Sequence, residues 1–458
     1  MTASPQLAIV LAAGHGTRMR SRLPKVAHPL AGRPVVRHVV DAARAAGVQD
    51  VVVVVGAGAE ADVVRAAAGD DVRFAVQGEA LGTGHAVESA RDAAGAAESV
   101  LIMNGDVPLV LPETLRRLLG ALADADLALL TAQVPVEQYG VLEMAGDRIV
   151  SVIETKAVEG VDRDEPRFIN SGQYAVRADW LWSHLSRITA APNGERYLTA
   201  LASMAHAEGN AGIAVIADDP AEVRGINDRV QLAEAEATLR GRIRRTHMLA
   251  GVTLLDPPST FIDAGVTIGA DTVLGANTHI VGQTAVGTDC VLGPGAHVRD
   301  SVIGDDCTVR ESMIEESTLE RHVDVGPYSH LRPGSHICED AHVGNYAEVK
   351  HTRLGKRTKM GHHSYIGDAE VGDDVNIGAG TITANYDGER KHRTIIGDGA
   401  FIGSDTMLVA PVRIGKGART SAGSVVTRDV PDGMMAIGAP ARIRAIGQEQ
   451  EESDSGQR

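Results

Sequence analysis

An aliphatic residue at every sixth position is the feature that most limits how the second half of this chain can fold. The interval begins at Ile268, Leu274, Ile280, Val286, Leu292 and Val298. It recurs at Leu319, Val325, Leu331, Ile337, Val343 and Val349, and again at Ile396, Ile402, Leu408 and Ile414. Because Gly or a small residue often stands beside the aliphatic one, the period suits neither an α-helix nor an isolated hairpin. It predicts short strands wound into a triangular coil, one face per hexad, with the aliphatic side chains filling the axis.

The period breaks once, over the ten residues ANYDGERKHR between Thr383 and Thr394. A polar insertion in a repeat coil is typical of a loop that projects from it, and such insertions commonly build binding faces. We therefore expect functional residues on this loop.

The first half has a different pattern, in which apolar runs alternate with amphipathic stretches. The runs at 7–13, 51–55, 99–104 and 127–134 predict buried strands, and the segments 34–47, 83–94 and 112–123 predict helices between them. This alternation indicates a parallel sheet covered on both faces. Ligands of such sheets bind beyond the carboxyl ends of the strands.

A chain of 458 residues exceeds what one hydrophobic core usually serves, so two domains are expected. Residues 228–249 form one uninterrupted helical pattern, which ends near Gly251 with Pro257 and Pro258 beyond it. We expect a first domain over 1–227, a linker helix over 228–251, the coil over 252–446 and a disordered tail over 447–458.

The formal net charge of −16 argues against a nucleic acid or an anionic membrane as partner. The three cysteines, Cys290, Cys307 and Cys338, are an odd count without a pairing framework, which fits a reducing compartment. The N-terminus has neither a basic region nor a long apolar stretch. These features together predict a cytoplasmic protein whose partners are small molecules.

Two motifs of the first half can hold phosphates and a metal ion. Gly14-His15-Gly16 follows the first strand, and Arg18 and Lys25 stand close behind it, so backbone N–H groups and two cations can meet phosphate oxygens. The loop lacks the G-K-[ST] of a Walker motif. Asn104-Gly105-Asp106 ends another strand, where a carboxylate can bind Mg²⁺.

These motifs resemble the sugar-phosphate nucleotidyltransferase family, because LAAGxGTRM, PK, LGTGHA, GDVPL and GxN occur in that family's order over residues 6–250. The resemblance implies a Rossmann-like α/β domain. It implies that Leu11, Ala12, Ala13, Gly14, Gln77, Gly82 and Thr83 contact UTP, that Lys25 contacts phosphate, and that Asn104 and Gly105 lie in the same site. It further implies that Asp106 and Asn227 hold Mg²⁺ and that Gly140, Glu154 and Asn170 bind the sugar.

In the second half, polar residues between the coils are the candidates for chemistry. Acyl transfer from a thioester to an amine needs a base that titrates near neutrality, for which histidine is best suited. The segment Gly361-His362-His363-Ser364-Tyr365 supplies two candidates. A phosphate on the acceptor needs cations, and Arg332 and Lys350 can serve.

With the coil included, the chain resembles the bifunctional N-acetylglucosamine-1-phosphate uridyltransferase/glucosamine-1-phosphate N-acetyltransferase family over all but about its last dozen residues. The resemblance implies a left-handed parallel β-helix of hexapeptide repeats and a homotrimer with shared sites. It implies acetylation of glucosamine 1-phosphate by acetyl-CoA, then uridylyl transfer from UTP with release of pyrophosphate. The product, UDP-N-acetylglucosamine, would feed peptidoglycan, lipopolysaccharide or other envelope glycans.

The same resemblance assigns residues of the coil. His362 would accept the proton, and the acetyl acceptor would bind Arg332, Lys350, Tyr365 and Asn376. Acetyl-CoA would contact Ala379, Asn385, Tyr386, Ser404 and Ala422. The chain departs from the family pattern at His15, Val141 and Ala200, and in the segment 436–444, where Arg442 is a candidate contact for CoA phosphates.

Two alternatives remain open at this point. One is a single-activity nucleotidyltransferase whose coil is structural or regulatory. The other is a zinc enzyme using His342, His362 and His363, although adjacent positions of a strand face opposite sides and therefore do not converge easily on one ion.

Overall fold

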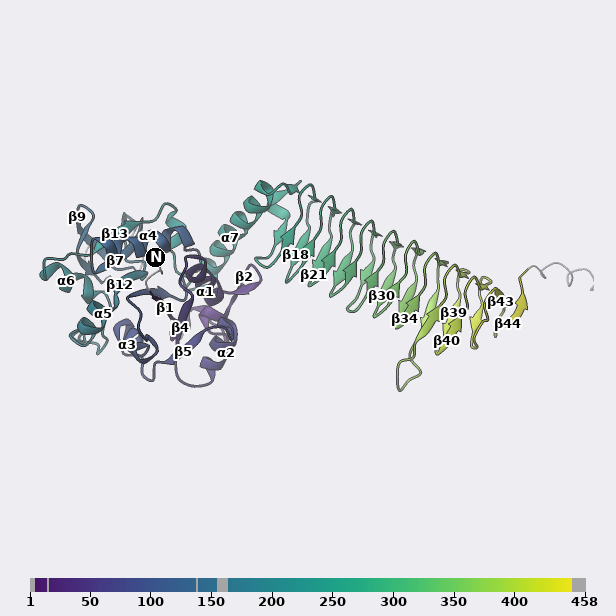
Figure 1. Cartoon of the computed structure of the whole chain (residues 1–458), viewed down its shortest axis with the longest axis horizontal. Coiled ribbons are helices and arrows are strands. Elements are labelled where there is room, and N and C mark those ends of the chain that lie inside the picture. Colours follow the sequence, from purple (N-terminus) through teal and green to yellow (C-terminus); the bar gives the residue numbers. More distant parts are fainter. Residues whose placement is uncertain (1–4, 15, 137–138, 155–163, 447–458) are drawn as a thin grey trace, which may run out of the picture. The chain divides into compact units, whose positions relative to one another are not determined.

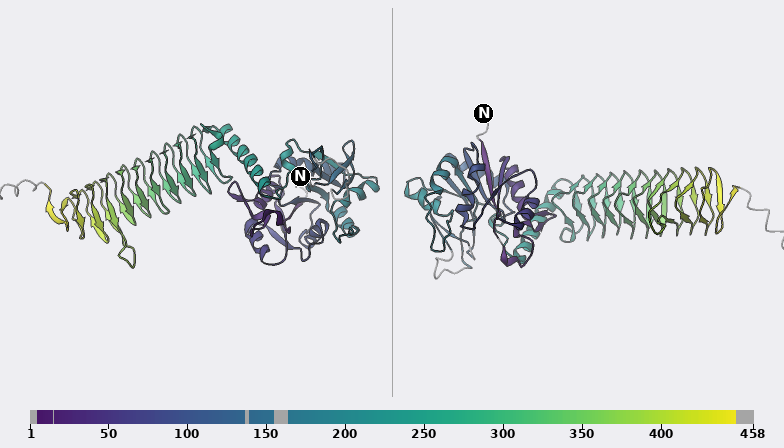
Figure 2. Two further views of the ribbon diagram at one scale, coloured as in Figure 1. Left: turned by 180° about the vertical axis from the view of Figure 1, so that it is seen from behind. Right: turned by 90° about the horizontal axis from the view of Figure 1, so that it is seen from below.

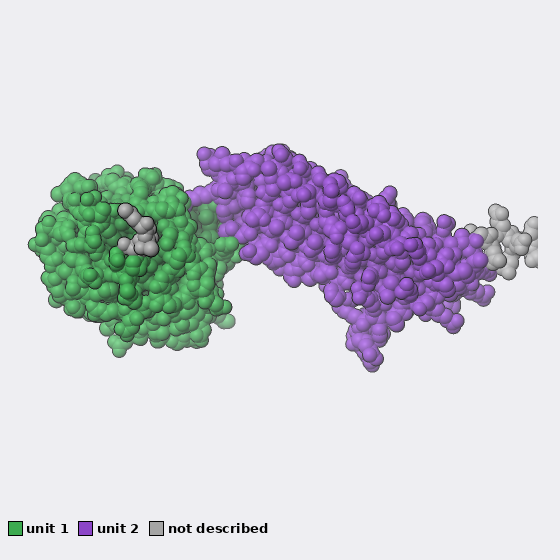
Figure 3. Space-filling model, in the orientation of Figure 1, with its two compact units in different colours: residues 1–239 green, residues 240–458 purple. Residues whose placement is uncertain are grey.

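The computed structural model describes residues 5–14, 16–136, 139–154 and 164–446. The chain divides into two compact units, residues 1–239 and 240–458 (Figure 3). The tail predicted at 447–458 lies outside the described residues. No helix in the described part of the chain is long and apolar enough to cross a membrane.

The first unit is built around a nine-stranded sheet of order β5-β4-β1-β6-β12-β7-β13-β10-β9 (Figures 1 and 2). Its parallel part contains β1 (Gln6–Leu11), β4 (Asp50–Val55), β5 (Arg73–Val76) and β6 (Ser99–Asn104), and β7 (Leu127–Thr131) pairs in parallel with β13 (Ile213–Ile216). The four predicted strands are thus present. Two small ribbons accompany the sheet: β2 (Pro29–Leu30) with β3 (Arg33–Pro34), and β8 (Gln133–Pro135) with β11 (Pro166–Phe168).

The sheet is mixed, so the predicted parallel sheet describes only part of it. β12 (Tyr174–Arg177) runs antiparallel to β6 and β7, and β9 (Val141–Ala145) and β10 (Arg148–Ile153) form an antiparallel pair. The reason is the entry point of β12. Gly172, just before it, lies against the side chain of Asn104 at the carboxyl end of β6, so β12 can only run back along that strand.

Helices cover both faces of this sheet, as predicted, because alternate residues of the strands point to opposite sides. Ala8 and Val10 of β1 belong to the core formed with α1 (Val35–Ala45), α2 (Ala59–Ala68) and α4 (Pro112–Gly120). Leu7 and Ile9 belong to the core formed with α3 (Thr83–Glu88), α5 (Ala178–Leu185) and α6 (Ala200–Ala207). The helices predicted at 83–94 and 112–123 end earlier, each followed by a 3₁₀ turn.

The helix α7 (Arg229–Leu249) crosses the boundary between the units. Its first half packs Leu232, Ala235 and Leu239 into a small cluster of the first unit. Its second half belongs to the coil: Ile243 packs on the coil core, and Arg240 Nη2 donates to Asp263 Oδ1 at 2.9 Å. The first half of α7 is therefore held by the first unit, and the second half is held by the coil.

The second unit is a parallel β-helix in which each strand up to β39 (Met407–Val409) pairs with the strand three places later. At its end, β41 (Arg419–Thr420) pairs with β43 (Met434–Ile437), which forms an antiparallel pair with β44 (Arg442–Ala445). The three sheets of this unit are named by their first and last strands. Face 1 runs from β14 (Thr253–Leu254) to β44, face 2 from β15 (Phe261–Ile262) to β42 (Val425–Val426), and face 3 from β16 (Thr267–Ile268) to β40 (Val412–Ile414). Face 1 contains β29 (His342–Asn345), β32 (Lys359–His362), β35 (Asn376–Ile377), β38 (Phe401–Ile402) and β41. Face 2 contains β27 (His330–Leu331), β30 (Glu348–Lys350), β33 (Tyr365–Gly367) and β36 (Ile382–Ala384). Face 3 contains β25 (Thr318–Leu319), β28 (His336–Ile337), β31 (Arg353–Leu354) and β37 (Thr394–Ile396).

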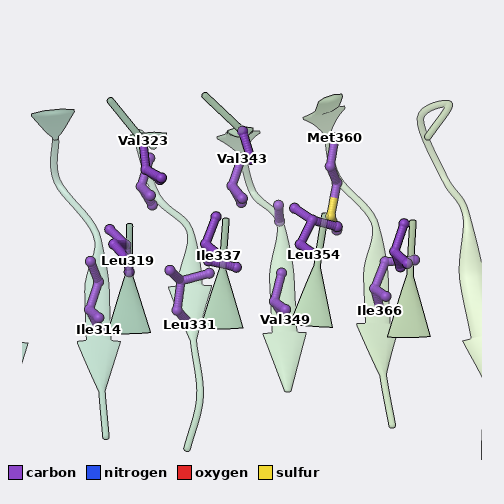
Figure 4. Packing of buried hydrophobic residues seen from close by; sticks show 14 of the residues in the cluster. Ile314, Leu319, Val323, Leu331, Ile337, Val343, Val349, Leu354, Met360 and Ile366 are labelled. Atoms are coloured by element: carbon purple, nitrogen blue, oxygen red, sulfur yellow. The ribbon is translucent and has the colours of Figure 1, made fainter. Parts of the chain in front are cut away.

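The predicted axial residues form one continuous core along this unit. Figure 4 shows Leu331, Ile337, Val343 and Val349 pointing into the axis. Where the six-residue period stops and restarts, single faces are one residue shorter: the axial residues there are Val298, Ile303, Val309, Ile314 and Leu319. The hexapeptide coil that the period predicted is thus confirmed.

The predicted loop lies between β36 and β37 and projects from the coil (Figures 1 and 3). Tyr386 and Lys391 pair across it as an antiparallel bridge, and the backbone N–H of His392 donates to the carbonyl of Asn385 at 2.7 Å. These bonds make the insertion a small hairpin.

Candidate active sites

A pocket of about 350 Å³ opens beyond the carboxyl ends of β1 and β6. Ten predicted residues line it: Leu11, Ala12, Ala13, Gly14, Lys25, Gln77, Gly82, Thr83, Asn104 and Asp106. Five residues to which the sequence assigned no role line it as well: Val26, Ala80, Ala86, Glu195 and Tyr197. Sequence motifs from three separate segments therefore meet in one cavity, where the sheet topology places ligands.

Two glycines allow the pocket walls to approach one another. Gly16 has a φ of +58°, and a Cβ on it would lie 2.6 Å from the Cβ of Lys25. Gly82 has a φ of +94°, and a Cβ there would lie 2.6 Å from the carbonyl oxygen of Arg196. Only glycine combines this conformation with such a close approach. The segment that packs against Gly82 contains Arg196. It brings Glu195 and Tyr197 to the pocket, although both lie more than a hundred positions later in the chain.

The proposed metal ligands converge on one cationic group. Lys25 Nζ forms an ion pair with Asp106 Oδ2 and donates to Asn227 Oδ1 at 3.1 Å, and Arg18 Nη2 donates to the same Asn227 oxygen at 3.1 Å. A carboxylate and an amide oxygen that face one positive charge are the donor types that Mg²⁺ prefers. The pair therefore fits a magnesium ion, with Lys25 marking where positive charge is favoured.

The three predicted sugar residues lie together beside this pocket, outside its lining. The backbone N–H of Asn170 donates to the carbonyl of Gly140 at 2.8 Å, and the Tyr174 hydroxyl donates to Asn170 Oδ1 at 3.0 Å. Burial, together with the nearby charge of Glu154, raises the pKa of Tyr174, so this hydroxyl stays protonated. Glu154 Oε1 accepts from the hydroxyl of Thr199 at 2.9 Å. Gly105 also lies outside the lining, where a Cβ would be 2.8 Å from the Leu11 carbonyl.

In the coil, the strand register stacks four predicted residues in one column at the corner between face 1 and face 2. Met360, Ile377 and Ile402 are successive axial partners, and the position two residues after each is occupied by His362, Ala379 and Ser404. The pairing of Phe401 with Arg419 extends the column to Ala422. Since His362, Ser404 and Ala422 are exposed, the column forms a surface strip of small side chains that starts at a histidine.

The histidine at the start of this strip is oriented by a neighbour that the sequence motifs did not indicate. His362 pairs in register with Asn345, and His362 Nδ1 lies 3.0 Å from Asn345 Oδ1. Because the amide oxygen only accepts, Nδ1 carries the proton, and in the neutral ring Nε2 keeps its lone pair. The geometry thus leaves Nε2 free to take a proton.

A cluster of three cations stands on face 2 under the loop. Arg332 and Lys350 follow the paired axial residues Leu331 and Val349 on successive coils, and Lys391 of the hairpin loop lies within hydrogen-bonding reach of Lys350. Hydrogen-bonding proximity to the Lys391 ammonium, with burial and the charge of Arg332, lowers the pKa of Lys350. A bound phosphate would relieve this mutual repulsion. Lys391 was missed because its place in the cluster depends on how the loop folds back.

The remaining predicted residues divide between two faces. Asn385 Nδ2 donates to Asp368 Oδ2 at 2.5 Å and to the Tyr365 hydroxyl at 3.4 Å, next to the cations of face 2. Asn376 is exposed on face 1, and Tyr386 is exposed on the loop. One chain by itself therefore does not bring Asn376 to the cation cluster.

Fold and sites together define a two-part transferase, with a nucleotidyltransferase unit followed by a hexapeptide-repeat unit. Family comparison agrees: residues 8–200 match the MobA-like NTP transferase domain, and residues 265–300 and 393–428 match the bacterial transferase hexapeptide (six repeats). Residues 289–383 match the GlmU-like, C-terminal hexapeptide.

Whole-chain relatives make the assignment specific. The chain is 45% identical over 447 residues to the bifunctional protein GlmU of Pelobacter propionicus, covering 96% of this chain and 97% of that protein. It is 42% identical over 448 residues to the bifunctional protein GlmU of Brevibacillus brevis, with 96% of each chain covered. The chain belongs to the family of bifunctional GlmU proteins, which confirms the predicted family and fold. The zinc alternative gains no support, because in the described residues the donor atoms of His342, His362 and His363 do not converge as a group.

Proposed function

We propose that this chain acetylates glucosamine 1-phosphate with its coil and makes UDP-N-acetylglucosamine with its first unit. The observation that carries the proposal is that the chain has two sets of groups: a pocket with a metal pair in the first unit, and a histidine strip and a cation cluster on the coil. Because both sets are present, two activities are favoured over a single nucleotidyl transfer with a structural coil.

In the first unit, a phosphate oxygen of N-acetylglucosamine 1-phosphate attacks the α-phosphorus of UTP, and the bond to the pyrophosphate leaving group breaks. Such a reaction needs positioning and charge neutralisation rather than a protein nucleophile. Gln77, Gly82 and Thr83 hold the nucleotide, and Lys25 neutralises phosphate. Mg²⁺, held by Asp106 and Asn227, would neutralise charge on the phosphates when bound.

In the coil, the amine of glucosamine 1-phosphate attacks the thioester carbonyl of acetyl-CoA. The C–N bond forms, the C–S bond breaks, CoA leaves as its thiolate, and His362 Nε2 takes the proton from the amine. Arg332, Lys350 and Lys391 hold the 1-phosphate, with Tyr365 and Asn376 on the sugar. Ala379, Asn385, Tyr386, Ser404 and Ala422 border acetyl-CoA along the exposed strip.

We further propose a homotrimer in which neighbouring coils complete each acetyl-transfer site. The division of the acceptor residues supports this, because Asn376 lies on face 1 and the cations lie on face 2. A second copy can present its face 1 to the face 2 of the first. The proposed location is the cytoplasm, where UTP and acetyl-CoA are available.

The domain boundaries we propose are 1–227 for uridyl transfer, 228–251 for the linker helix and 252–446 for acetyl transfer. A fragment of residues 1–250 should release pyrophosphate and sediment as a monomer or weak oligomer. A fragment of residues 228–458 should acetylate and sediment as a trimer. Both keep the whole of α7, whose halves pack on different units. Full acetyl transfer by a monomeric second fragment would refute the shared site.

Replacing Lys391 with methionine should raise the KM for glucosamine 1-phosphate by roughly 10-fold or more, because one charge-assisted bond to phosphate is lost. The KM for acetyl-CoA should hardly change, and uridyl transfer should be normal. Lys416→Met, a lysine near Asp398 on a later coil, is the matched control. An unchanged acceptor KM would remove Lys391 from the phosphate site.

The function itself is tested by incubating the full chain with glucosamine 1-phosphate, acetyl-CoA, UTP and Mg²⁺. Free thiol and pyrophosphate are followed separately. We expect thiol release without UTP, and pyrophosphate release only when acetylated sugar is formed or supplied. Pyrophosphate release without any acetyl transfer would instead support the single-activity alternative.

A further inference from the structure

A column of glycines runs along face 3, one residue after each axial side chain. Seven coils have Gly at this position: Gly269, Gly287, Gly304, Gly355, Gly372, Gly397 and Gly415. Two consecutive coils are exceptions and carry Glu320 and Cys338, which follow the paired residues Leu319 and Ile337. The exceptions are adjacent, so their side chains are stacked neighbours.

The column has a steric reason to be glycine. A Cβ added at any of the seven glycines would lie 2.2–2.8 Å from a backbone atom of the next coil. Real Cβ atoms do not come this close, so a side chain here requires a local adjustment of the backbone. Glu320 and Cys338 thus stand where the rest of the coil admits no side chain, and this indicates a specific use.

The side chains of Glu320 and Cys338 lie close to the side chain of one histidine, His336. His336, on the same strand as Ile337, has Nε2 2.8 Å from Glu320 Oε1. The donor atoms of Glu320, His336 and Cys338 all lie within 4.8 Å of one another. Of all the side chains in the described ranges, only these three form such a group of histidine, cysteine and acidic donors.

The carboxylate of Glu320 is also held in place. Its second oxygen, Oε2, accepts from the backbone N–H of Glu339 at 2.9 Å, which leaves Oε1 turned toward His336. Orientation of a ligand by a further hydrogen bond is usual in metal centres. Cys338 is fully buried, whereas Glu320 and His336 are partly exposed, so the group is closed on the sulfur side and open to solvent on the other.

We propose that Glu320, His336 and Cys338 form a site for a divalent transition-metal ion of the zinc type. Thiolate sulfur, imidazole nitrogen and carboxylate oxygen are the three ligand types of zinc, and three protein ligands leave one position for water. The ion would replace the His336–Glu320 hydrogen bond and tie two successive coils together. The site lies in the coil and shares no residue with the magnesium pair Asp106 and Asn227.

Cobalt(II) titration of the full chain tests this site directly. The protein is stripped with a chelator, kept reduced with a phosphine, and titrated with Co²⁺ alone. We expect a sulfur-to-cobalt charge-transfer band that saturates at one ion per chain and disappears when Zn²⁺ is added. Binding without this band, or no binding at all, would overturn the proposal.

The best test variants are Cys338→Gly and the double variant Cys338→Gly/Glu320→Gly. Both introduce the glycine that the other coils carry at this position. We expect the band to vanish while the thermal unfolding of the metal-free chain stays cooperative with an unchanged or higher Tm. Cys290→Ser, at a buried cysteine of an earlier coil, should keep the band. Asp106→Ala should keep it also. A band that survives Cys338→Gly would place the ion elsewhere and refute the assignment.

Discussion

Replacing His362 with alanine is expected to lower the kcat of acetyl transfer by roughly 10²–10⁴-fold, the usual contribution of a general base. Asn345 Oδ1 faces Nδ1 at 3.0 Å and leaves Nε2 to take the proton from the amine. The KM for acetyl-CoA should change little, because the imidazole acts on the amine and the donor is held by other residues. Thiol release under saturating substrates measures the effect.

The matched control is His363→Ala, at the neighbouring histidine to which we assign no role. It should keep a near-normal rate, and uridyl transfer should be normal in both variants. A normal His362→Ala beside a collapsed His363→Ala would overturn the assignment.

Replacing Asp106 with alanine should lower pyrophosphate release by at least about 10³-fold, because the site loses the only charged oxygen of the proposed metal pair. Lys25 also loses the carboxylate with which it forms an ion pair. Acetyl transfer should survive at the parental rate, since its residues lie in the coil. The measurement follows pyrophosphate and free thiol in the same preparation.

Asn227→Ala should act in the same direction with a smaller effect, because an uncharged ligand is removed. Raising the Mg²⁺ concentration should recover part of the rate of Asn227→Ala and little of Asp106→Ala. Loss of both activities in an Asp106→Ala protein that remains folded would contradict the independence of the two units.

The regular parts of the fold could be predicted because each follows from a short-range pattern. The six-residue period located the coil axis, and residues such as Leu331 and Val349 are buried where it placed them. The period could not anticipate the five-residue faces around Ile303 and Ile314, since in-register pairing tolerates one residue more or less at a corner. Nor could it show that β12 enters the first sheet from the opposite end.

Site residues were predictable where a motif carries them and were missed where the fold alone brings them in. Glu195 and Tyr197 reach the nucleotide pocket because the segment before α6 bonds to the loop around Gly82. Asn345 reaches His362 through strand register, one coil earlier. Neither relation exists in the linear sequence, because both depend on which backbones become neighbours.

In the proposed function, the strip from His362 through Ala379 and Ser404 to Ala422 would set the distance between the two ends of bound acetyl-CoA. Neighbouring strands lie about 4.8 Å apart, so three steps along the coil span roughly 14 Å. The spacing is fixed by backbone hydrogen bonds and does not depend on side-chain packing. The distance between the two ends of a donor bound along this strip would therefore be a whole number of coils. Its thioester would reach His362 only if its other end is anchored that number of turns away. Removing one turn between them would leave every contact chemically intact and the reacting atoms out of reach.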